Sequence, residues 1–300
     1  CPHCQAKIRE LGLKDDDKHT AEQFLQSYVT ARIEKFLAGK GKKIIGWDEI
    51  LEGELSPNAT VMSWRGVAGG LEAARLGHDA IMTPYDFCYL DYYQNGIHDK
   101  EPYLCIGGDL PVEKCYSYEP ISEDMSAEEA AHILGVQANL WTEYISTEDH
   151  LYYQLLPRLT ALSEVQWCNK DRKDWKRFSD SAEEFCAIFD KMGHNYASHI
   201  FGILHEVKVN NETHCIEVTL STPGNTPIRY TLDGSEPGAD SKLYTGTIVL
   251  DKSCTLKATA LRNEKWTGRL VIDFADSKAF GGPVTGVGIP VKKYTYNYPY

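Results

Sequence analysis

Hydrophobic residues recur every three or four positions between residues 20 and 38, which is the pattern of an amphipathic helix. Thr20 and Gln23 have the spacing of a capping box at the start of this segment, and Gly39 and Gly41 follow its end. We therefore predict a helix here. The apolar side chains on its common face are Phe24, Leu25, Tyr28, Val29, Ile33, Phe36 and Leu37.

Short apolar stretches and helical stretches then alternate along the chain. Strands are expected at residues 43–47, 59–64, 79–83 and 133–138, and helices at 71–76, 126–132 and 148–167. This alternation predicts an α/β fold with a parallel sheet. Each strand ends in a polar or aromatic cluster, which is where barrel enzymes carry their catalytic residues.

After Phe201 the pattern changes to short strands separated by Pro-Gly and Asp-Gly turns, which predicts a small antiparallel β module over residues 202–274. The tail, residues 275–300, is rich in Gly, Pro and Tyr and is expected to be a linker or the start of a further module. Residues 1–201 form the first predicted domain. The strands expected in the β module are residues 207–209, 215–220, 228–232, 247–250 and 255–261.

Charge and cysteine usage narrow the class of protein. The chain has 31 Lys and Arg against 43 Asp and Glu, and this net charge of -12 argues against a general nucleic-acid binder. No apolar run approaches the ~18 residues that a membrane-spanning helix needs. We expect no cofactor, because the sequence contains neither a phosphate-binding loop nor a His-Glu-x-x-His motif.

The nine cysteines are odd in number and scattered, which argues against a disulfide scaffold. One close pair, Cys1-Pro2-His3-Cys4, has the spacing of a redox motif or of half a zinc site. No strand precedes it and no second pair completes four metal ligands. We therefore interpret it as a solvent-side loop that leads into a helix.

Three tryptophans, Trp47, Trp64 and Trp141, stand at the carboxyl ends of predicted parallel strands. They would converge on the mouth of a barrel, where flat apolar rings stack on sugars or enclose a methyl group. The alternative is that they are ordinary core residues. Core packing is our prediction for the other tryptophans, Trp167, Trp175 and Trp266.

Polar candidates follow the same strand ends. Tyr89 and Asp91 are two residues apart, so in extended chain they face the same side. A phenol can donate to a developing oxyanion, and a carboxylate can accept from sugar hydroxyls. Glu143 follows Trp141 at the same two-residue spacing. The alternative for all three is a surface position without function.

Five motifs contain these candidate residues or follow them along the chain: Gly46-Trp47-Asp48-Glu49-Ile50, Met62-Ser63-Trp64-Arg65-Gly66, Tyr89-Leu90-Asp91, Gly135-Val136-Gln137-Ala138-Asn139-Leu140-Trp141-Thr142-Glu143, and Leu156-Pro157-Arg158 with Glu164 and Trp167. Together they closely resemble the β-N-acetylhexosaminidases of glycoside hydrolase family 20. The resemblance covers residues 1–201, while residues 228–261 resemble the β-sandwich that often follows in chitobiase-like members. It implies an α/β fold consisting of the C-terminal half of a (β/α)8 TIM barrel, followed by a small antiparallel β-sandwich.

The resemblance implies an exo-acting enzyme that removes terminal non-reducing GlcNAc or GalNAc from a glycan. Its mechanism would be retaining and substrate-assisted, with the substrate's own 2-acetamido oxygen as nucleophile. The three strand-end tryptophans would enclose the acetamide, and Tyr89 would donate to its oxygen. Asp91 and Glu143 would accept hydrogen bonds from the outer hydroxyls of the sugar. The substrate class implies a periplasmic or secreted protein.

The family's acid/base Glu and the Asp before it lie in a Gly-Gly-Asp-Glu motif, which is absent from this sequence. Asp48-Glu49 matches the motif of the next strand, and Gly107-Gly108-Asp109 is followed by Leu110, so we assign neither pair as catalytic. We expect the chain to begin shortly after the true pair and to hold barrel strands five to eight. Half a parallel barrel leaves strand edges unpaired, so we also expect poor solubility.

Two alternatives remain open at this point. The first is a non-catalytic carbohydrate-binding protein on the same barrel, in which aromatic stacking persists without the acid. The second is a different barrel glycosidase, in which Asp91 and Glu143 form a conventional acid/base pair.

Because the Gly-Gly-Asp-Glu motif is absent, we predict that the chain alone does not hydrolyse glycosides. The purified chain should release no product from a chromogenic β-N-acetylglucosaminide. Release that grows in proportion to the amount of purified chain would contradict this prediction.

Overall fold

The computed structural model describes residues 1–53, 55–96, 98, 101–210, 212–213, 215–262 and 265–275, without the side chains of residues 225 and 265–267. The chain forms two compact units, Cys1–Ile200 and Phe201–Tyr300. Of the predicted tail, residues 276–300 lie outside the described residues.

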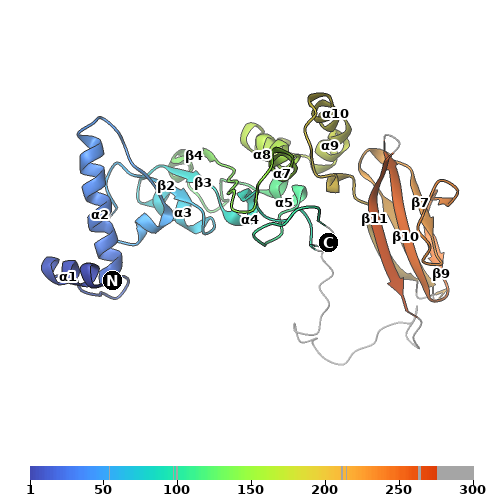
Figure 1. Ribbon diagram of the computed structural model, residues 1–300, viewed down its shortest axis with the longest axis horizontal. Helices are drawn as coiled ribbons and strands as arrows, with labels where there is room; N and C mark the ends of the chain where they lie inside the picture. Colours follow the sequence, from blue (N-terminus) through green and yellow to red (C-terminus); the bar gives the residue numbers. More distant parts are fainter. Residues whose placement is uncertain are drawn as a thin grey trace. The chain divides into compact units, whose positions relative to one another are not determined.

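The first unit is built on a parallel sheet, as the alternating pattern predicts. Its strands follow sequence order and all neighbours are parallel (Figure 1). The centre of the sheet is apolar: Val61, Ala80 and Met82 are buried. The strands are β1 (Ile45–Trp47), β2 (Thr60–Ser63), β3 (Ala80–Met82) and β4 (Ile133–Val136).

Short helices connect these strands. Helix α3 (Ala68–Arg75) packs on β2 and β3 through its small residues Ala73 and Ala74, which are buried. The predicted helix over 126–132 is confirmed as α6, with a capping box between Ser126 and Glu129. The remaining connecting elements are η1 (Asp48–Leu51), α4 (Tyr85–Cys88), α5 (Val112–Ser117) and α6 (Ala127–Ala131).

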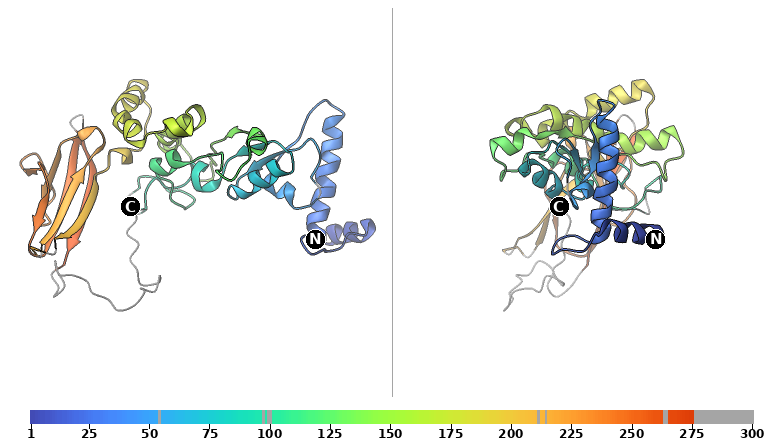
Figure 2. Two further views of the ribbon diagram at one scale, coloured as in Figure 1. Left: turned by 180° about the vertical axis from the view of Figure 1, so that it is seen from behind. Right: turned by 90° about the vertical axis from the view of Figure 1, so that its left-hand side faces the viewer.

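Two further helices precede the sheet and pack against each other (Figure 2). Helix α1 (Pro2–Leu11) begins directly at Pro2, so the interpretation of Cys1 to Cys4 as a loop is wrong. Helix α2 (Ala21–Ala38) has the predicted capping box at Thr20. Its apolar face, however, is only partly covered by the described residues: Val29 is 49% exposed, Ile33 49% and Phe36 66%.

The single helix predicted over residues 148–167 is wrong. The structure has two helices, α7 (Glu148–Leu155) and α8 (Arg158–Trp167), separated at Leu156 and Pro157. Proline lacks the N–H donor and disfavours helical backbone in the residue before it, and Leu156 accordingly has extended backbone. The later helices are η3 (Lys170–Arg172), α9 (Trp175–Asp180), α10 (Ala182–Met192) and η4 (His199–Phe201).

The prediction that Trp167 packs in a core is also wrong, because this side chain is 90% exposed. The buried face of α8 is formed by Arg158, Ala161, Leu162 and Val165 at helical spacing, and Trp167 falls on the opposite side. Trp175 is half-buried against Phe178 and Tyr116, while the side chain of Trp266 lies outside the described part.

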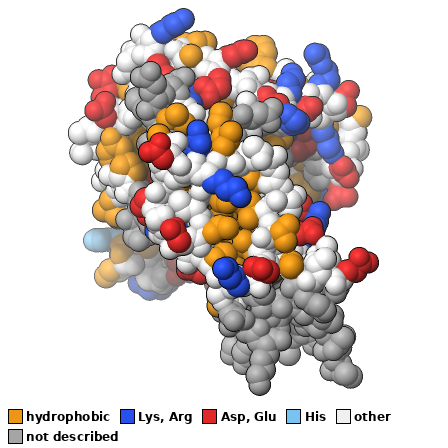
Figure 3. All heavy atoms as spheres, turned by 90° about the vertical axis from the view of Figure 1, so that its right-hand side faces the viewer, with side chains coloured by type: hydrophobic (Ala, Val, Ile, Leu, Met, Phe, Trp, Pro, Cys, Tyr) orange, Lys and Arg blue, Asp and Glu red, His pale blue; other side chains and the backbone are white. Residues whose placement is uncertain are grey.

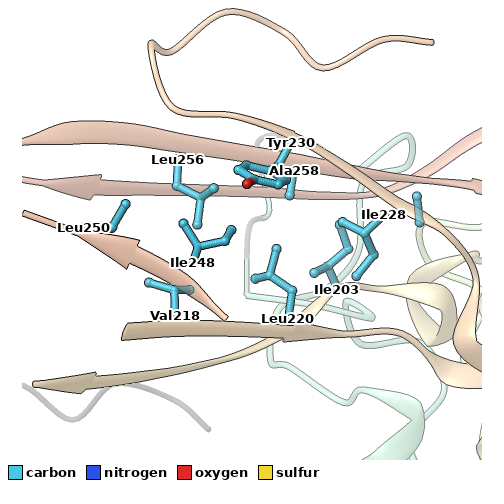
Figure 4. Packing of buried hydrophobic residues seen from close by; sticks show 10 residues of the cluster. Ile203, Val218, Leu220, Ile228, Tyr230, Ile248, Leu250, Leu256 and Ala258 are labelled. Atoms are coloured by element: carbon cyan, nitrogen blue, oxygen red, sulfur yellow. The ribbon is translucent and has the colours of Figure 1, made fainter. Parts of the chain in front are cut away.

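The second unit is an antiparallel β-sandwich. One sheet has the order β11-β10-β7-β8 and the other β5-β6-β9, and their inward side chains meet in one core (Figure 4). Val218 and Leu220 of one sheet face Tyr230 and Leu256 of the other. The elements are β5 (Leu204–Asn210), β6 (Cys215–Ser221), η5 (Pro223–Asn225), β7 (Ile228–Thr231), β8 (Lys242–Leu243), β9 (Ile248–Leu250), β10 (Cys254–Arg262) and β11 (Lys265–Phe274).

Strand β11 is not among the predicted strands, because Gly268 interrupts its hydrophobic pattern. The glycine has φ of 62°, and the pairing with β10 shifts register between Ala258 and Ala260 at this point. A Cβ atom at position 268 would lie 2.7 Å from the carbonyl oxygen of Phe201. A glycine at a bulge therefore keeps this strand in the sheet.

Charged residues of both signs are mixed with hydrophobic ones on the molecular face drawn in Figure 3. No single sign of charge dominates that face. Among the helices that the structure describes, none is both long and apolar enough to cross a bilayer.

Arg158 is the most deeply buried charged residue of the first unit, with an exposure of 0%. Its guanidinium donates to the backbone carbonyls of Leu90, Tyr92, Leu110 and Gln154. Two of these carbonyls flank Asp91 on either side. The guanidinium therefore fixes the path of the chain between Tyr89 and Tyr92 against helix α8.

Replacement of Arg158 by Met keeps the length of the side chain and removes every donor. We expect the free energy of unfolding to fall by about 3 kcal/mol or more, because each unpaired buried acceptor costs ~1–3 kcal/mol. Urea denaturation followed by circular dichroism measures this change. The exposed Arg172→Met is the matched control and should stay within about 0.5 kcal/mol of the parent chain. Equal stability of the two variants would contradict the prediction.

Candidate functional site

Beyond the carboxyl ends of β1, β2 and β4 lies a pocket of about 350 Å³. Five of the six predicted site residues line it, and Asp91 does not. Glu49, which the sequence analysis did not assign, lines it as well. The complete lining is Trp47, Glu49, Trp64, Tyr89, Trp141 and Glu143.

The register of the parallel sheet brings these side chains together. Trp47 is the last residue of β1 and pairs with Met62, so Trp64 follows just beyond the end of β2. Past β3 the chain returns to the sheet at Tyr89, which forms a parallel bridge with Asn139. Trp141 then follows two residues later. Parallel strands end at one edge of a sheet, and the aromatic rings collect there.

The aromatic side chains form two facing pairs. The ring centroids of Trp47 and Trp141 are 5.9 Å apart with an interplanar angle of 48°. Those of Trp64 and Tyr89 are 6.3 Å apart and stacked at 27°. These separations are within the range at which aromatic pairs attract each other. The pocket walls are therefore held by contacts among the rings themselves.

Glu49 fixes the orientation of one indole. Both of its carboxylate oxygens accept from Nε1 of Trp64, at 3.1 and 3.0 Å. A hydrogen bond from an indole to a charged acceptor is stronger than one between neutral groups. The sequence could have pointed to Glu49 as a pocket residue, because Trp47 and Glu49 have the same spacing as Trp141 and Glu143.

Asp48 holds the backbone that carries Trp64. This buried carboxylate accepts from the backbone N–H groups of Trp64 at 3.0 Å and Arg65 at 3.1 Å, and from Nε of Arg65 at 2.6 Å. Arg65 also forms an ion pair with Glu52. The pKa of Glu52 is lowered by hydrogen bonds from Gln23 and from Arg65. Asp48 is thus occupied by structural hydrogen bonds.

Tyr89 lines the pocket and is only 8% exposed. Burial raises the pKa of its phenol above 10.0, while hydrogen bonding with the side chains of Trp141 and Asn139 opposes the rise. At neutral pH the hydroxyl therefore keeps its proton and can act as a hydrogen-bond donor.

Asp91 is 5% exposed and, within the described part of the chain, its Oδ1 atom has no hydrogen-bond partner. Burial raises the pKa of its carboxyl group above 3.8, and the nearby charge of Glu143 adds to the rise, whereas Arg158 opposes it. An unpaired buried oxygen is costly unless a ligand satisfies it. Asp91 is therefore a buried carboxyl group outside the pocket lining, whereas Glu143 is exposed and lines the pocket.

The described residues contain no group of three or more His, Cys, Asp and Glu side chains arranged to hold a metal ion. The pocket instead combines apolar walls, one phenol donor and two carboxylates on its lining. Such a combination can enclose a small apolar group on a polar ring and bind the hydroxyls of that ring.

Family models match both units. The model of the glycosyl hydrolase family 20 catalytic domain matches residues 1–170, and a model described as Fn3 associated matches residues 216–272. A β-hexosaminidase from Porphyromonas gingivalis is 41% identical over 263 residues, covering 86% of this chain and 32% of that protein. A β-hexosaminidase from Vibrio furnissii is 35% identical over 164 residues, covering 54% of this chain and 26% of that protein.

A solved structure is similar as well. The exo-β-N-acetylglucosaminidase of glycoside hydrolase family 20 from Vibrio harveyi, in complex with N-acetylglucosamine, superposes with a TM-score of 0.56 at 31% identity. The match covers 65% of this chain and 30% of that one. The chain spans about a third of the length of the Porphyromonas relative. Because the catalytic-domain model matches more than half of the residues, from 1 to 170, the chain belongs to glycosyl hydrolase family 20.

Proposed function

We propose that this chain contributes the sugar-binding part of an exo-acting β-N-acetylhexosaminidase. The enzyme removes terminal non-reducing GlcNAc or GalNAc from glycans and retains the configuration at the anomeric carbon. The observation that carries the proposal is the pocket in which three indoles surround space beside a buried phenol. Relatives named β-hexosaminidases and a family structure that holds N-acetylglucosamine support it.

In this proposal the nucleophile belongs to the substrate. The oxygen of its 2-acetamido group attacks the anomeric carbon, as family 20 enzymes do in place of the usual second carboxylate. Trp47, Trp64 and Trp141 enclose the acetamide, bend it beneath the ring and exclude water. Intramolecular nucleophiles held in line reach effective molarities of ~10⁵ to 10⁸ M, so this enclosure provides a large part of the rate.

Tyr89 donates a hydrogen bond to the acetamide oxygen in the cyclic intermediate. Its raised pKa keeps the donor protonated over the neutral range, and stacking on Trp64 fixes the ring. Removing such a donor from a developing charge typically costs ~10² to 10³ in kcat. Tyr89 is the residue of this chain that we assign to catalysis.

Asp91 and Glu143 bind the outer hydroxyls of the terminal sugar. A hydroxyl that reaches Oδ1 of Asp91 satisfies an oxygen that otherwise lacks a partner in the described part of the chain. Glu143 is exposed and lines the pocket, and it binds the sugar from the solvent side. Two carboxylates on one ring set its orientation, and with it the alignment of the acetamide.

Terminal N-acetylhexosamines occur on glycans outside the cytoplasm, so we place this protein in the periplasm or outside the cell.

The sequence of the β-sandwich does not indicate a set of polar side chains that would converge on one site. We therefore assign this module a packing or spacing role.

The first test measures binding to the isolated chain. The ligand is the thiazoline derivative of N-acetylglucosamine, which mimics the cyclic intermediate, and titration calorimetry measures its affinity. Trp141→Ala should weaken binding ~10-fold or more, because the indole contributes apolar contact worth about 1.5–3 kcal/mol. Trp167→Ala is the matched control, since this tryptophan is 90% exposed and lies outside the pocket lining. Equal affinities of the two variants would exclude the pocket as the binding site.

The second test concerns catalysis in an active protein that contains this chain. Tyr89→Phe should lower kcat ~10² to 10³-fold with little change in KM. Tyr92→Phe is the control, because this phenol neighbours Tyr89 but does not line the pocket. An unchanged kcat in Tyr89→Phe would remove this residue from the mechanism.

The same protein separates the alternatives through its substrates. Substrate assistance requires the 2-acetamido group, so a plain β-glucoside should not be hydrolysed. Equal hydrolysis of both substrates would favour Asp91 and Glu143 as a conventional acid/base pair. The carbohydrate-binding alternative would instead be favoured if a longer natural protein that contains this chain bound N-acetylglucosamine but hydrolysed neither substrate.

A further inference from the structure

Two thiols meet at the start of helix α1. The Sγ atoms of Cys1 and Cys4 are 3.3 Å apart, and both residues are exposed. Cys1 is the N-cap of the helix, and its sulfur accepts from the backbone N–H of Cys4 at 3.5 Å. A disulfide has a sulfur separation of about 2.0 Å, so a small rotation of the two side chains closes the bond.

The helical backbone brings the two thiols together. Cys1 and Cys4 are three residues apart at the start of α1, and residues at this spacing lie on the same face of a helix.

Other cysteines of the chain differ from this pair. Burial raises the pKa of the Cys105 thiol to about 11 and that of Cys115 to about 12, and it also raises the pKa of Cys88. Cys168 and Cys215 are only partly exposed, and their thiols donate to the backbone carbonyls of Asn169 and Thr213. Cys1 and Cys4 are the exposed cysteines among the free thiols of the described residues.

We propose that Cys1 and Cys4 form a reversible intramolecular disulfide by exchange with a small-molecule disulfide of the glutathione class. One thiolate attacks a sulfur of the oxidised small molecule, whose S–S bond breaks and releases one thiolate. The second cysteine then loses its proton and attacks the mixed disulfide, and a second small-molecule thiolate leaves. The cysteine pair loses two electrons and two protons, and the small-molecule disulfide is reduced to two thiols.

The bond would lock the first turn of a helix that supports the pocket indirectly. Gln5 of α1 donates to Glu22 of α2 at 2.8 Å, and Gln26 of α2 donates to the backbone carbonyl of Glu49 at 3.1 Å. This inference is independent of the proposed enzyme activity.

The experiment equilibrates the purified chain, with a chelator present, in glutathione buffers of increasing oxidised fraction at pH 7. Alkylation of the remaining thiols and mass spectrometry of the N-terminal peptide then give the state of the pair. We expect the peptide to become lighter by two hydrogens and to lose both alkylation sites together, and to regain them in excess reduced glutathione.

Three variants make the result specific. Cys1→Ser and Cys4→Ser should each stop at a mixed disulfide with glutathione, and Cys168→Ser/Cys215→Ser should behave as the parent chain. Because both cysteines are exposed, the single variants should keep the circular dichroism spectrum of the parent. The proposal is overturned if the peptide keeps two alkylated thiols in every buffer, or if each cysteine forms only mixed disulfides. A bond from Cys1 or Cys4 to any other cysteine would overturn it as well.

Discussion

The candidate site depends on one buried guanidinium. Arg158 reaches from helix α8 and donates to carbonyls on both sides of Asp91, so the segment that carries Tyr89 and Asp91 has a single backbone path. A buried charge is tolerated only when its donors are paired, and backbone carbonyls provide that pairing here without a carboxylate partner. Arg158 therefore links helix α8 to the segment that carries Tyr89 and Asp91.

The parallel sheet brings the other pocket residues together at one edge. Strands β1, β2 and β4 deliver one tryptophan each to the same edge, and the chain beyond β3 delivers the phenol. Each ring is then held by a neighbour: Trp64 by Glu49 and Tyr89, and Trp47 by Trp141. These contacts hold the rings in place before a ligand binds. Preorganisation of this kind lowers the entropy that binding must overcome.

Much of this arrangement could be predicted from the sequence. Alternating strands and helices predict the parallel sheet, and family membership confirms the predicted fold class. Residues at strand ends must lie near one another, which is why Trp47, Trp64 and Trp141 could be singled out. The antiparallel pairing of the β module follows in the same way from short strands and turn residues.

Other features depend on contacts that periodicity does not encode. The partnership of Glu49 with Trp64 joins residues on different strands, and the carbonyls around Arg158 come from segments far apart in the chain. The break at Pro157 was visible in the sequence, but the helical pattern on both sides outweighed it. The prediction that Trp167 packs in a core was wrong for a different reason. Large apolar residues are usually buried, yet this position on α8 faces solvent.

The position of the pocket at the end of β1 has a dynamic consequence. Trp47 is the last residue of this three-residue strand, and both Trp47 and Glu49 line the pocket. A sugar bound there as proposed would therefore contact the carboxyl end of β1. Occupancy of the pocket should then slow amide hydrogen exchange along Ile45–Trp47, coupling ligand concentration to the local stability of this strand.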